Sequence, residues 1–316
     1  MKAWQFTGVH QPLELNDVAE PVAGPGYVVV DVRASGLCHS DVGMLEDPEF
    51  PFPPGGPRPM TLGHEIAGVI SAIGEGVTGW KIGDRVGICM TNDPAPGLSE
   101  HGGFAAKVAT SADFLVKVPD NLPFSIAAAA TDSGVAPHHA VIVVGGVTAG
   151  TKVGIMGVGG LGQMGARIAV LAGADVFVAE PREDVWQMAR ELGAVRVAKD
   201  ISEFADENLD VIIDFAGVGS STTAAIETVR AGGRVVQVGM SKRTAEISTY
   251  DVVTRRISLL GTMGGWRSDL ESVYKYLASG ELKPEVSTIS FDRIADGLAR
   301  LSRGEVVGRL VALLPE

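Results

Sequence analysis

The chain has 316 residues, 46% of them hydrophobic and 20% charged, a length that favours two domains, each with its own core. Its formal net charge of −12 repels phosphate backbones and anionic lipid, so nucleic-acid and membrane partners are not expected. The 41 glycines follow no fixed period, and the composition excludes a collagen-like or disordered chain.

The first part of the chain, as far as about residue 131, has the pattern of short strands separated by turns. Residues 1–15 contain no apolar run long enough for a signal peptide. Apolar runs predict strands at 28–32, 67–73, 84–88 and 105–108. Residues 48–59 (PEFPFPPGGPRP) are too rich in proline and glycine for a helix or a central strand, and predict a surface loop.

From about residue 153 the pattern alternates between strands and helices. Strands are predicted at 152–156, 175–179, 195–198, 210–216, 234–239 and 257–261, and helices at 161–171, 184–192 and 222–229. Such alternation is typical of βαβ units and of a parallel sheet covered on both faces. A further helix is predicted at 270–278, and the strand-like tail at 306–315 could return to the first domain. No run approaches the ~20 apolar residues that a membrane span needs.

Residues 157–162 (GVGGLG) fit the pattern G-x-G-x-x-G, placed after a strand and at the start of a helix, as dinucleotide binding requires. Gly157 permits the tight turn, and Gly159 lets a pyrophosphate approach the backbone. Gly162 allows the helix to pack closely on the strand, and the phosphates would sit at the helix N-terminus. Gly160 and Leu161 complete this predicted coenzyme loop.

The strand that follows the loop ends at Glu180, where an acidic residue is expected in this type of site. Its carboxylate can accept hydrogen bonds from both adenosine ribose hydroxyls and would repel a 2′-phosphate, which favours NAD over NADP. Arg182 could instead attract such a phosphate, so the coenzyme preference stays open.

The strongest resemblance lies at residues 62–69 (LGHEIAGV) with Gly74 and Val77, which match each fixed position of the zinc alcohol dehydrogenase signature. Residues 36–41 (GLCHSD) and 131–140 (TDSGVAPHHA) resemble that family's first and third ligand segments. The chain therefore resembles the zinc-containing alcohol dehydrogenases of the medium-chain dehydrogenase/reductase superfamily. This implies an α/β protein with a GroES-like, β-rich catalytic domain at 1–133 and 265–316, and a doubly wound, parallel-sheet Rossmann coenzyme domain at 134–264.

The resemblance implies a catalytic zinc ion held by Cys38, His64 and Asp132, although many family members have cysteine at the third position. One thiolate, one imidazole and one carboxylate leave a formally neutral site with an open fourth position, which is typical of catalytic zinc. Glu65 resembles the family carboxylate behind the metal, an alternative fourth ligand. Asp41 resembles the carboxylate that orients the ligand imidazole.

Residues 90–101 (MTNDPAPGLSEH) correspond to a lobe that carries four cysteines in the family and none here, with Cys89 just before it. Because one thiol cannot form a Cys₄ site, we predict one zinc per chain and a core role for Cys89. The sparse use of cysteine is typical of a reducing compartment, so a cytoplasmic location is expected. His138 and His139, which follow a proline, are expected to be structural.

The resemblance also assigns roles in hydride transfer between NAD(H) and an alcohol or ketone. Ser40 would accept the alcohol proton and pass it towards the nicotinamide ribose, and His39 and Arg309 would lie near the pyrophosphate. Backbone groups of Val238 and Met240 would hold the carboxamide. The protein would thus orient the reactants, while the hydride chemistry belongs to the coenzyme. The implied assembly is a homodimer or homotetramer.

Two other functions stay open: a zinc-free quinone or enoyl reductase of the same superfamily, and a non-catalytic regulator that binds NAD or zinc. The ligand set argues against the first, while Ser40 and the lack of a basic patch argue against the second. The family's relay histidine is replaced by Gly43, which is expected to widen the substrate pocket. Phe50, Phe52 and Trp266 could line that pocket, which favours a bulky secondary alcohol or ketone.

Overall fold

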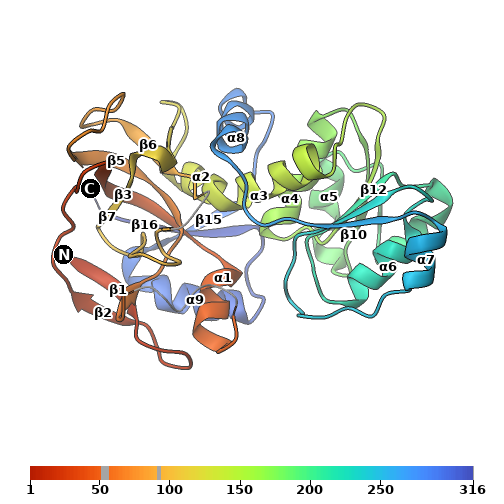
Figure 1. The fold of residues 1–316 in the computed structure, drawn as a ribbon, viewed down its shortest axis with the longest axis horizontal. Coiled ribbons are helices and arrows are strands. Elements are labelled where there is room, and N and C mark those ends of the chain that lie inside the picture. The colour runs from red at the N-terminus through yellow and green to blue at the C-terminus, as the bar shows by residue number, and fades with distance from the viewer. Residues whose placement is uncertain (51–56, 91–93, 316) are drawn as a thin grey trace. The chain divides into compact units, whose positions relative to one another are not determined.

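The computed structural model describes residues 1–50, 57–90 and 94–315 (Figure 1). The chain divides into two compact units: unit 1 comprises Met1–Val135 and Trp266–Glu316, and unit 2 comprises Ala136–Gly265. Residues 51–56, part of the loop expected at 48–59, lie outside the described residues. No helix within the described ranges is both long and apolar enough to cross a membrane.

Unit 1 combines short strands with a few helices. Its strands, within the described residues, are β1 (Lys2–Phe6), β2 (Glu14–Asp17), β3 (Tyr27–Leu37), β4 (Met60–Thr61), β5 (Glu65–Ile73), β6 (Arg85–Ile88), β7 (Lys107–Ser111), β8 (Leu115–Lys117), β15 (Val286–Ser290) and β16 (Arg309–Leu313). Its helices there are α1 (His39–Glu46), α2 (Phe124–Ala129), α8 (Arg267–Ser279) and α9 (Ile294–Ser302), with the short turns η1 (Ala112–Phe114), η2 (Ala130–Gly134) and η6 (Phe291–Arg293).

Strand β3 is the centre of the larger sheet of unit 1. Among the described residues the strand order is β15-β16-β3-β5-β6-β8, and β7 pairs with the first half of β3. β3 runs antiparallel to β5 and to β16, with Gly36 opposite Glu65 and Leu37 opposite Leu310. The segments that follow β3, precede β5 and begin β16 therefore meet at one edge of the sheet. The return of the tail to the first domain is confirmed by β16.

Helix α9 anchors the first helix of the chain. Ile294, Leu298 and Leu301 lie at i, i+4 and i+7, and all three are buried. They belong to a hydrophobic cluster that also contains Leu37 at the end of β3 and Val42 of α1. Helix α1 is therefore held in place by apolar packing, and the chain segment between β3 and α1 has a fixed position.

Unit 2, all of whose residues are described, is a parallel sheet with helices. Its strands are β9 (Lys152–Met156), β10 (Asp175–Ala179), β11 (Arg196–Ala198), β12 (Val211–Asp214), β13 (Arg234–Gln237) and β14 (Ser258–Gly261). Its helices are α3 (Val135–His138, from the last residue of unit 1), α4 (Gly160–Leu171), α5 (Trp186–Glu191), α6 (Ser220–Thr228) and α7 (Thr249–Thr254), with the turns η3 (His139–Val144), η4 (Glu183–Val185) and η5 (Ile201–Glu207).

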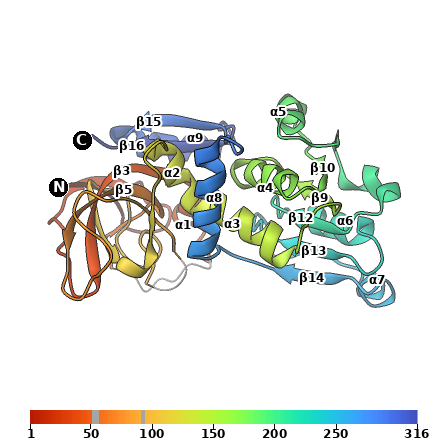
Figure 2. The ribbon, with the colours of Figure 1, turned by 90° about the horizontal axis from the view of Figure 1, so that it is seen from above.

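The strand order of unit 2 creates a binding crevice. The strands run parallel in the order β11-β10-β9-β12-β13-β14, of which Figure 2 shows the run from β10 to β14, and α4 and α6 lie on opposite faces of the sheet in Figure 1. The predicted parallel sheet covered on both faces is thus confirmed. Strand order reverses between β9 and β12, and in such sheets dinucleotides bind at the carboxyl ends of the strands beside this reversal.

Two predicted elements differ in detail from the observed ones. The strand expected at 105–108 is displaced to β7, because Ala105 instead forms an isolated bridge with Ala3. The helix expected at 184–192 starts as the turn η4 before α5 begins. In the first case a contact distant in sequence sets the boundary, which a local pattern does not contain.

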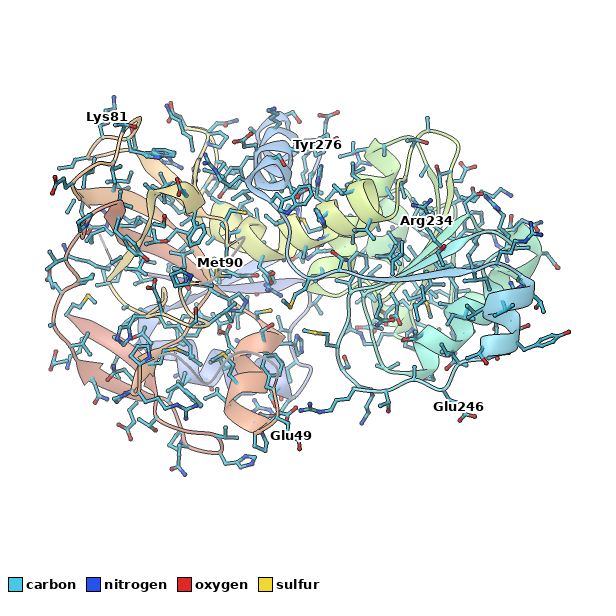
Figure 3. The ribbon with its side chains drawn as sticks, in the orientation of Figure 1. Glu49, Lys81, Met90, Arg234, Glu246 and Tyr276 are labelled. Atoms are coloured by element: carbon cyan, nitrogen blue, oxygen red, sulfur yellow. The ribbon has the colours of Figure 1, made fainter. Side chains whose placement is uncertain are left out.

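Replacing Tyr274 with Phe is expected to lower the free energy of unfolding by about 1–2 kcal/mol, because a buried hydrogen bond is lost. The Tyr274 hydroxyl is buried and donates to Ala127 O at 3.0 Å. Urea denaturation of both proteins measures the difference. Tyr276→Phe, at a half-buried position of the same helix (Figure 3), is the control and is expected to change stability by less than about 0.5 kcal/mol. Equal losses for the two variants would contradict the prediction.

Candidate metal centre and coenzyme loop

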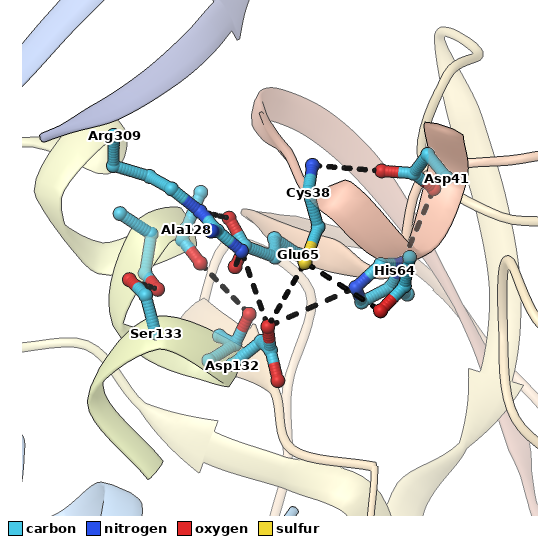
Figure 4. Close-up of polar contacts among 11 residues, drawn as sticks. Cys38, Asp41, His64, Glu65, Ala128, Asp132, Ser133 and Arg309 are labelled. Atoms are coloured by element: carbon cyan, nitrogen blue, oxygen red, sulfur yellow. Dashed lines mark hydrogen bonds and ion pairs between the residues drawn. The ribbon is translucent and has the colours of Figure 1, made fainter. Parts of the chain in front are cut away.

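Three side chains from distant parts of unit 1 form a group able to hold a metal ion. Cys38, His64 and Asp132 each offer one donor atom, and these atoms lie within 4.8 Å of one another. Asp132 Oδ2 is 3.5 Å from Cys38 Sγ and 3.8 Å from His64 Nε2 (Figure 4). Among the His, Cys, Asp and Glu residues in the described ranges, this is the one such group. The three expected ligands are therefore brought together, and metal binding by them stays a prediction.

Cys38 is held by the way helix α1 begins. It follows the last residue of β3 and is the N-cap of α1. Its backbone N–H donates to Asp41 Oδ2 at 2.9 Å, so the side chain of the third helix residue binds the backbone of the N-cap residue. The Cys38 thiol lies 3.7 Å from Ser40 Oγ in the same turn. The position of the sulfur is thus fixed by a strand end and a helix start.

Asp41 also orients the imidazole of His64. Its Oδ1 lies 3.2 Å from His64 Nδ1, so the neutral ring donates from Nδ1 and turns the Nε2 lone pair towards the donor group. Burial by itself would lower the pKa of His64, but Asp41 and Asp132 raise that pKa well above its usual value. A cation that binds here therefore has to displace a proton from the ring.

Asp132 lies in one wide turn of helix. In η2 the backbone N–H of Val135 donates to Ala130 O, five residues back, which is the pattern of a π-helix. The hydroxyls of Thr131 and Ser133 donate to backbone carbonyls of the preceding turn at 2.8 and 2.6 Å (Figure 4). Those two side chains are thereby turned back onto the helix, while the carboxylate of Asp132 points to Cys38 and His64.

Arg309 lies behind this group and binds two carboxylates. Its Nε donates to Glu65 Oε2 at 2.9 Å, and its Nη2 donates to Glu65 Oε1 and, at 3.1 Å, to Asp132 Oδ2. Gly36 leaves the room for this pair, because a Cβ there would lie 1.8 Å from Glu65 Oε2. Burial raises the pKa of Glu65 to about 7, and the Arg309 guanidinium opposes that rise.

The ion pair between Glu65 and Arg309 restricts the roles expected of both residues. Glu65 was expected as an alternative metal ligand and Arg309 as a pyrophosphate contact, but both side chains are buried and bound to each other. Either role requires the pair to separate, at least in part. Both roles stay predictions, and the structure adds a further role for Arg309, which is to hold the carboxylate of Asp132.

The donor group fits Zn²⁺ by its chemistry. Thiolate, imidazole and carboxylate are the ligands that zinc prefers, and three protein ligands leave a fourth position for substrate. Burial would raise the pKa of Asp132, but His64 and Arg309 hold it well below its usual value, so the group is ionised as a ligand must be. The second nitrogen of His64 already has the carboxylate partner that metal-bound imidazoles normally have.

The glycine loop has the shape that a pyrophosphate needs. Gly157 adopts a φ of +81°, a conformation that favours glycine. A Cβ on Gly162 would lie 1.8 Å from Gly157 O. Helix α4 can therefore approach strand β9 this closely only because residue 162 has no side chain. Gly159 is exposed at the N-cap of α4, with Gly160 and Leu161 half-buried after it.

Glu180 is fixed beside this loop. Its Oε2 accepts from the N–H of Val158 and its Oε1 from the N–H of Arg182, each at 3.0 Å, and the side chain is buried. The Arg182 guanidinium also lies 3.6 Å from the same carboxylate. The acidic group is therefore held where an adenosine ribose is expected, and Arg182 is already paired with it.

The other residues expected at the coenzyme lie on the surface or near it. His39 is exposed and Ser40 is half-buried in the first turn of α1. The Val238 N–H donates to Asp214 O at 3.0 Å, so the carbonyl oxygen is what Val238 has to offer a carboxamide. Met240 is 50% exposed. Their roles towards the coenzyme stay predictions.

The expectation that Gly43 widens a pocket is corrected by the structure. A Cβ on Gly43 would lie 2.3 Å from the ring of Phe50, so the space left by the missing side chain is filled by that ring. Trp266 is 58% exposed, and Phe52 lies outside the described residues. Gly43 is therefore explained by packing, and it gives no support for a larger substrate.

Three further residues were expected to lie apart from the metal group. Cys89 is buried, and burial raises the pKa of its thiol to about 12. His138 and His139 are buried at the junction of α3 and η3. None of the three belongs to the donor group found among the described residues.

Sequence reasoning assigned no role to two further residues. Gly36 makes room for Glu65, and Asp214 is a buried carboxylate with four hydrogen bonds at the end of β12. A signal for Asp214 existed, because an acidic residue that ends an apolar strand before a glycine-containing loop (DVIIDFAG) is out of place in a core.

Comparisons with known proteins agree with the geometry. Residues 24–120 match the Alcohol dehydrogenase GroES-like domain family, and residues 160–279 match the Zinc-binding dehydrogenase family. An alcohol dehydrogenase of Geobacillus stearothermophilus is 31% identical over 98% of this chain and 99% of its own length. The NADP-dependent alcohol dehydrogenase C 1 of Mycolicibacterium smegmatis is 25% identical over 98% of this chain and 97% of its own.

A solved structure gives the same result for the fold. The acetophenone reductase of Geotrichum candidum in complex with NAD aligns with a TM-score of 0.89 and 30% identity, over 99% of this chain and 96% of that one. The expected fold class, a GroES-like domain with a Rossmann domain, is confirmed by these matches and by the sheet orders described above.

In the folded Cys38→Ser variant, we expect no reaction with Ellman's reagent at pH 8 within minutes. The remaining thiol, Cys89, is buried and its pKa of about 12 keeps it protonated. In denaturant one thiol per chain should react. The wild-type protein is the control, and in denaturant two thiols per chain should react. Rapid labelling of Cys89 in the folded variant would show that the interior around it is open.

Proposed function

Because this chain belongs to the zinc-containing alcohol dehydrogenase family of medium-chain dehydrogenases/reductases, we propose that it is a zinc-dependent oxidoreductase that transfers hydride between NAD(H) and an alcohol or ketone. The observation that carries the proposal is the grouping of Cys38, His64 and Asp132 within 4.8 Å. The glycine loop and Glu180 in unit 2 support the coenzyme.

In this proposal the residues at the metal site have distinct roles. Cys38, His64 and Asp132 hold the ion, and Asp41 fixes the tautomer and direction of the imidazole. Zn²⁺ bound there supplies a Lewis acid that polarises the substrate oxygen. Arg309 keeps Asp132 ionised and holds Glu65 away from the ion, which leaves a position open for substrate.

The proposed proton path begins at Ser40. Its hydroxyl lies 3.7 Å from the thiol of Cys38, next to the donor group, and is half-buried. In oxidation it accepts the alcohol proton as it releases its own towards the coenzyme ribose, and in ketone reduction the transfer is reversed. NAD⁺ supplies the hydride acceptor at its nicotinamide ring.

The proposed preference for NAD over NADP rests on Glu180. Two backbone N–H groups hold its carboxylate in place, so it cannot easily move aside for a 2′-phosphate. Arg182 is the residue that could reverse this preference, but its guanidinium faces the same carboxylate. Since one relative is NADP-dependent, both coenzymes belong in the test.

A secondary alcohol or its ketone is the proposed substrate class. Support comes from the 30% identity with an acetophenone reductase over nearly the whole chain. The packing of Phe50 on Gly43 removes the argument for an enlarged pocket, so substrate size is left out of the proposal.

We propose the cytoplasm as the location of the protein. Both cysteines are free, which suits a reducing compartment.

Strand β14 supports the proposed homodimer or homotetramer. It ends the six-stranded order of unit 2, all of whose residues are described, and each of its residues is exposed. Leu259 and Leu260 are 41% and 36% exposed there. An exposed apolar edge strand is an unfavourable surface unless another strand covers it, and a second copy could pair with it across a two-fold axis.

The proposed activity is tested by elemental analysis and by NADH oxidation on a panel of ketones, before and after chelation. We expect about one zinc per chain. Removing zinc should lower turnover by about a hundredfold or more, because a Lewis acid is worth several kcal/mol in the transition state. Cys38→Ser should lower both zinc content and turnover, while Cys89→Ala, the matched control, should change neither.

The outcomes of this test separate the candidate functions. Turnover without zinc would place the protein with the zinc-free reductases, and zinc and NADH binding without turnover on any substrate would favour a regulator. Turnover with NADPH equal to that with NADH would contradict the role proposed for Glu180 alone.

The proposed assembly is tested by light scattering on the variant in which Leu259 and Leu260 are both changed to Glu. We expect a smaller assembly than the wild type, because two charges per chain would be placed in the strand pairing. Val22→Glu, an 85% exposed apolar position in unit 1, is the control and should leave the mass unchanged. A monomeric wild type, or an unchanged mass in the double variant, would contradict the proposal.

A further inference from the structure

Asp214 is a buried acidic residue at the carboxyl end of the central strand β12. Its Oδ1 accepts hydrogen bonds from the N–H groups of Ala216 and Gly217, at 3.0 and 2.8 Å. Its Oδ2 accepts from the hydroxyls of Ser221 and Thr222, at 2.7 and 3.0 Å. The carboxylate therefore organises the loop after β12 and the start of helix α6.

The four donors of this carboxylate are neutral groups, and its side chain is fully buried. Burial of an ionised group is expensive, and neutral donors compensate for it only in part. An apolar residue would suit the core at this place better if stability were the only demand. Stability alone therefore does not explain the carboxylate, whereas its contacts with the loop after β13 do.

Asp214 and its partners also bind the loop after β13. The backbone oxygen of Asp214 accepts from the N–H groups of Val238 and Gly239, at 3.0 and 2.9 Å. The Thr222 hydroxyl lies 2.8 Å from Gln237 Oε1, and Gln237 Nε2 donates to Gly239 O at 2.7 Å. Thr222 thus shares its one hydroxyl hydrogen between the carboxylate and a side chain that shapes the second loop.

The two loops, residues 215–219 and 237–242, touch backbone to backbone. Gly217 has a φ of +59°, and a Cβ on it would lie 2.1 Å from the carbonyl group of Gly239. Ser241 Oγ donates to Ala216 O at 2.7 Å, and Lys242 N donates to Gly217 O at 2.8 Å. Because there is no space between these paired loops, a shift in one moves the other.

The paired loops lie where the second half of a dinucleotide is expected. They follow β12 and β13, which belong to the second half of the sheet, beside the reversal of strand order. A Cβ on Gly157, in the coenzyme loop, would lie 3.4 Å from Ala216 Cβ. The first half of such a sheet takes the adenosine, so the loops after β12 and β13 face the nicotinamide half.

We propose that Asp214 is a positioning residue that holds the paired loops in the conformation that receives the nicotinamide half of the coenzyme. The proposal rests on the proposed function, since it requires that the chain bind NAD(H). Asp214 touches no reacting atom in this proposal. It acts through the backbone of residues 237–242, which include Val238 and Met240.

The test compares NADH with ADP-ribose, which lacks the nicotinamide ring, on the zinc-loaded Asp214→Asn variant. Asparagine keeps one acceptor but places an NH₂ group opposite the two hydroxyls, so the loop loses charge-assisted hydrogen bonds. We expect the affinity for NADH, measured by NADH fluorescence, to weaken about tenfold. ADP-ribose binding, followed by calorimetry, should change less than about twofold, because its contacts lie at the coenzyme loop and Glu180.

Asp210→Asn is the matched control, since Asp210 lies just before the same strand at its opposite end. Like Asp214, it has a hydrogen-bonded carboxylate, which accepts from Lys152 N at 2.8 Å and from Arg230 Nε at 2.7 Å. We expect this variant to lose stability without changing the ratio of the two affinities. Thr222→Val, which keeps the carboxylate but cuts its link to Gln237, should shift the ratio in the same direction by a smaller factor.

The outcomes distinguish this proposal from the proposed function. If Asp214→Asn folds and weakens NADH and ADP-ribose equally, or weakens neither, the proposal is overturned. If Asp214→Asn does not fold, an unchanged affinity ratio in Thr222→Val overturns it instead. If the wild-type protein binds neither nucleotide, the proposed function fails, and this proposal fails with it.

Discussion

In unit 1, the register of β3 against β5 and β16 decides which side chains meet at the candidate metal site. Gly36 stands opposite Glu65, and Leu37 stands opposite Leu310, so the residues just beyond these pairs converge at one edge. A shift of one residue in either pairing would turn the whole strand over and send its core side chains to the other face. The hydrophobic cluster that contains Leu37 opposes any such shift.

That convergence concentrates charge in a buried place, and the charges compensate one another. Three carboxylates, those of Asp41, Glu65 and Asp132, surround the imidazole of His64 and the guanidinium of Arg309. A buried network of this kind adds little net stability, because desolvation cancels much of the attraction. Its presence is better explained by function. Asp41 and Glu65 fix the positions of the imidazole and the guanidinium, and Asp132 is kept ionised, as the proposed metal ligand must be.

The sequence was sufficient for features that repeat or that depend on short-range spacing. The parallel sheet of unit 2 and the shape of the glycine loop are of this kind, whereas Cys38, His64 and Asp132 lie far apart in sequence, and their grouping was expected only from the family resemblance. It was insufficient for contacts made across the fold. The ring of Phe50 on Gly43 and the pairing of Arg309 with Glu65 join segments separated by turns or by most of the chain, and no local pattern encodes them. Strand β2 (ELND) contains one apolar residue, so no apolar run marks it in the sequence.

The wide turn that carries Asp132 makes the site sensitive to chain length as well as to residue type. Exchanging Asp132 for another ligand, such as cysteine, changes the donor atom and leaves the backbone path as it is. Deleting one residue from η2 would instead let the turn close into a regular α-helix, and each residue of an α-helix advances by about 100° around the axis. The donor would then face a different direction although its identity were kept. Insertions and deletions in this turn should therefore be far rarer among functional descendants of this chain than substitutions at the ligand itself.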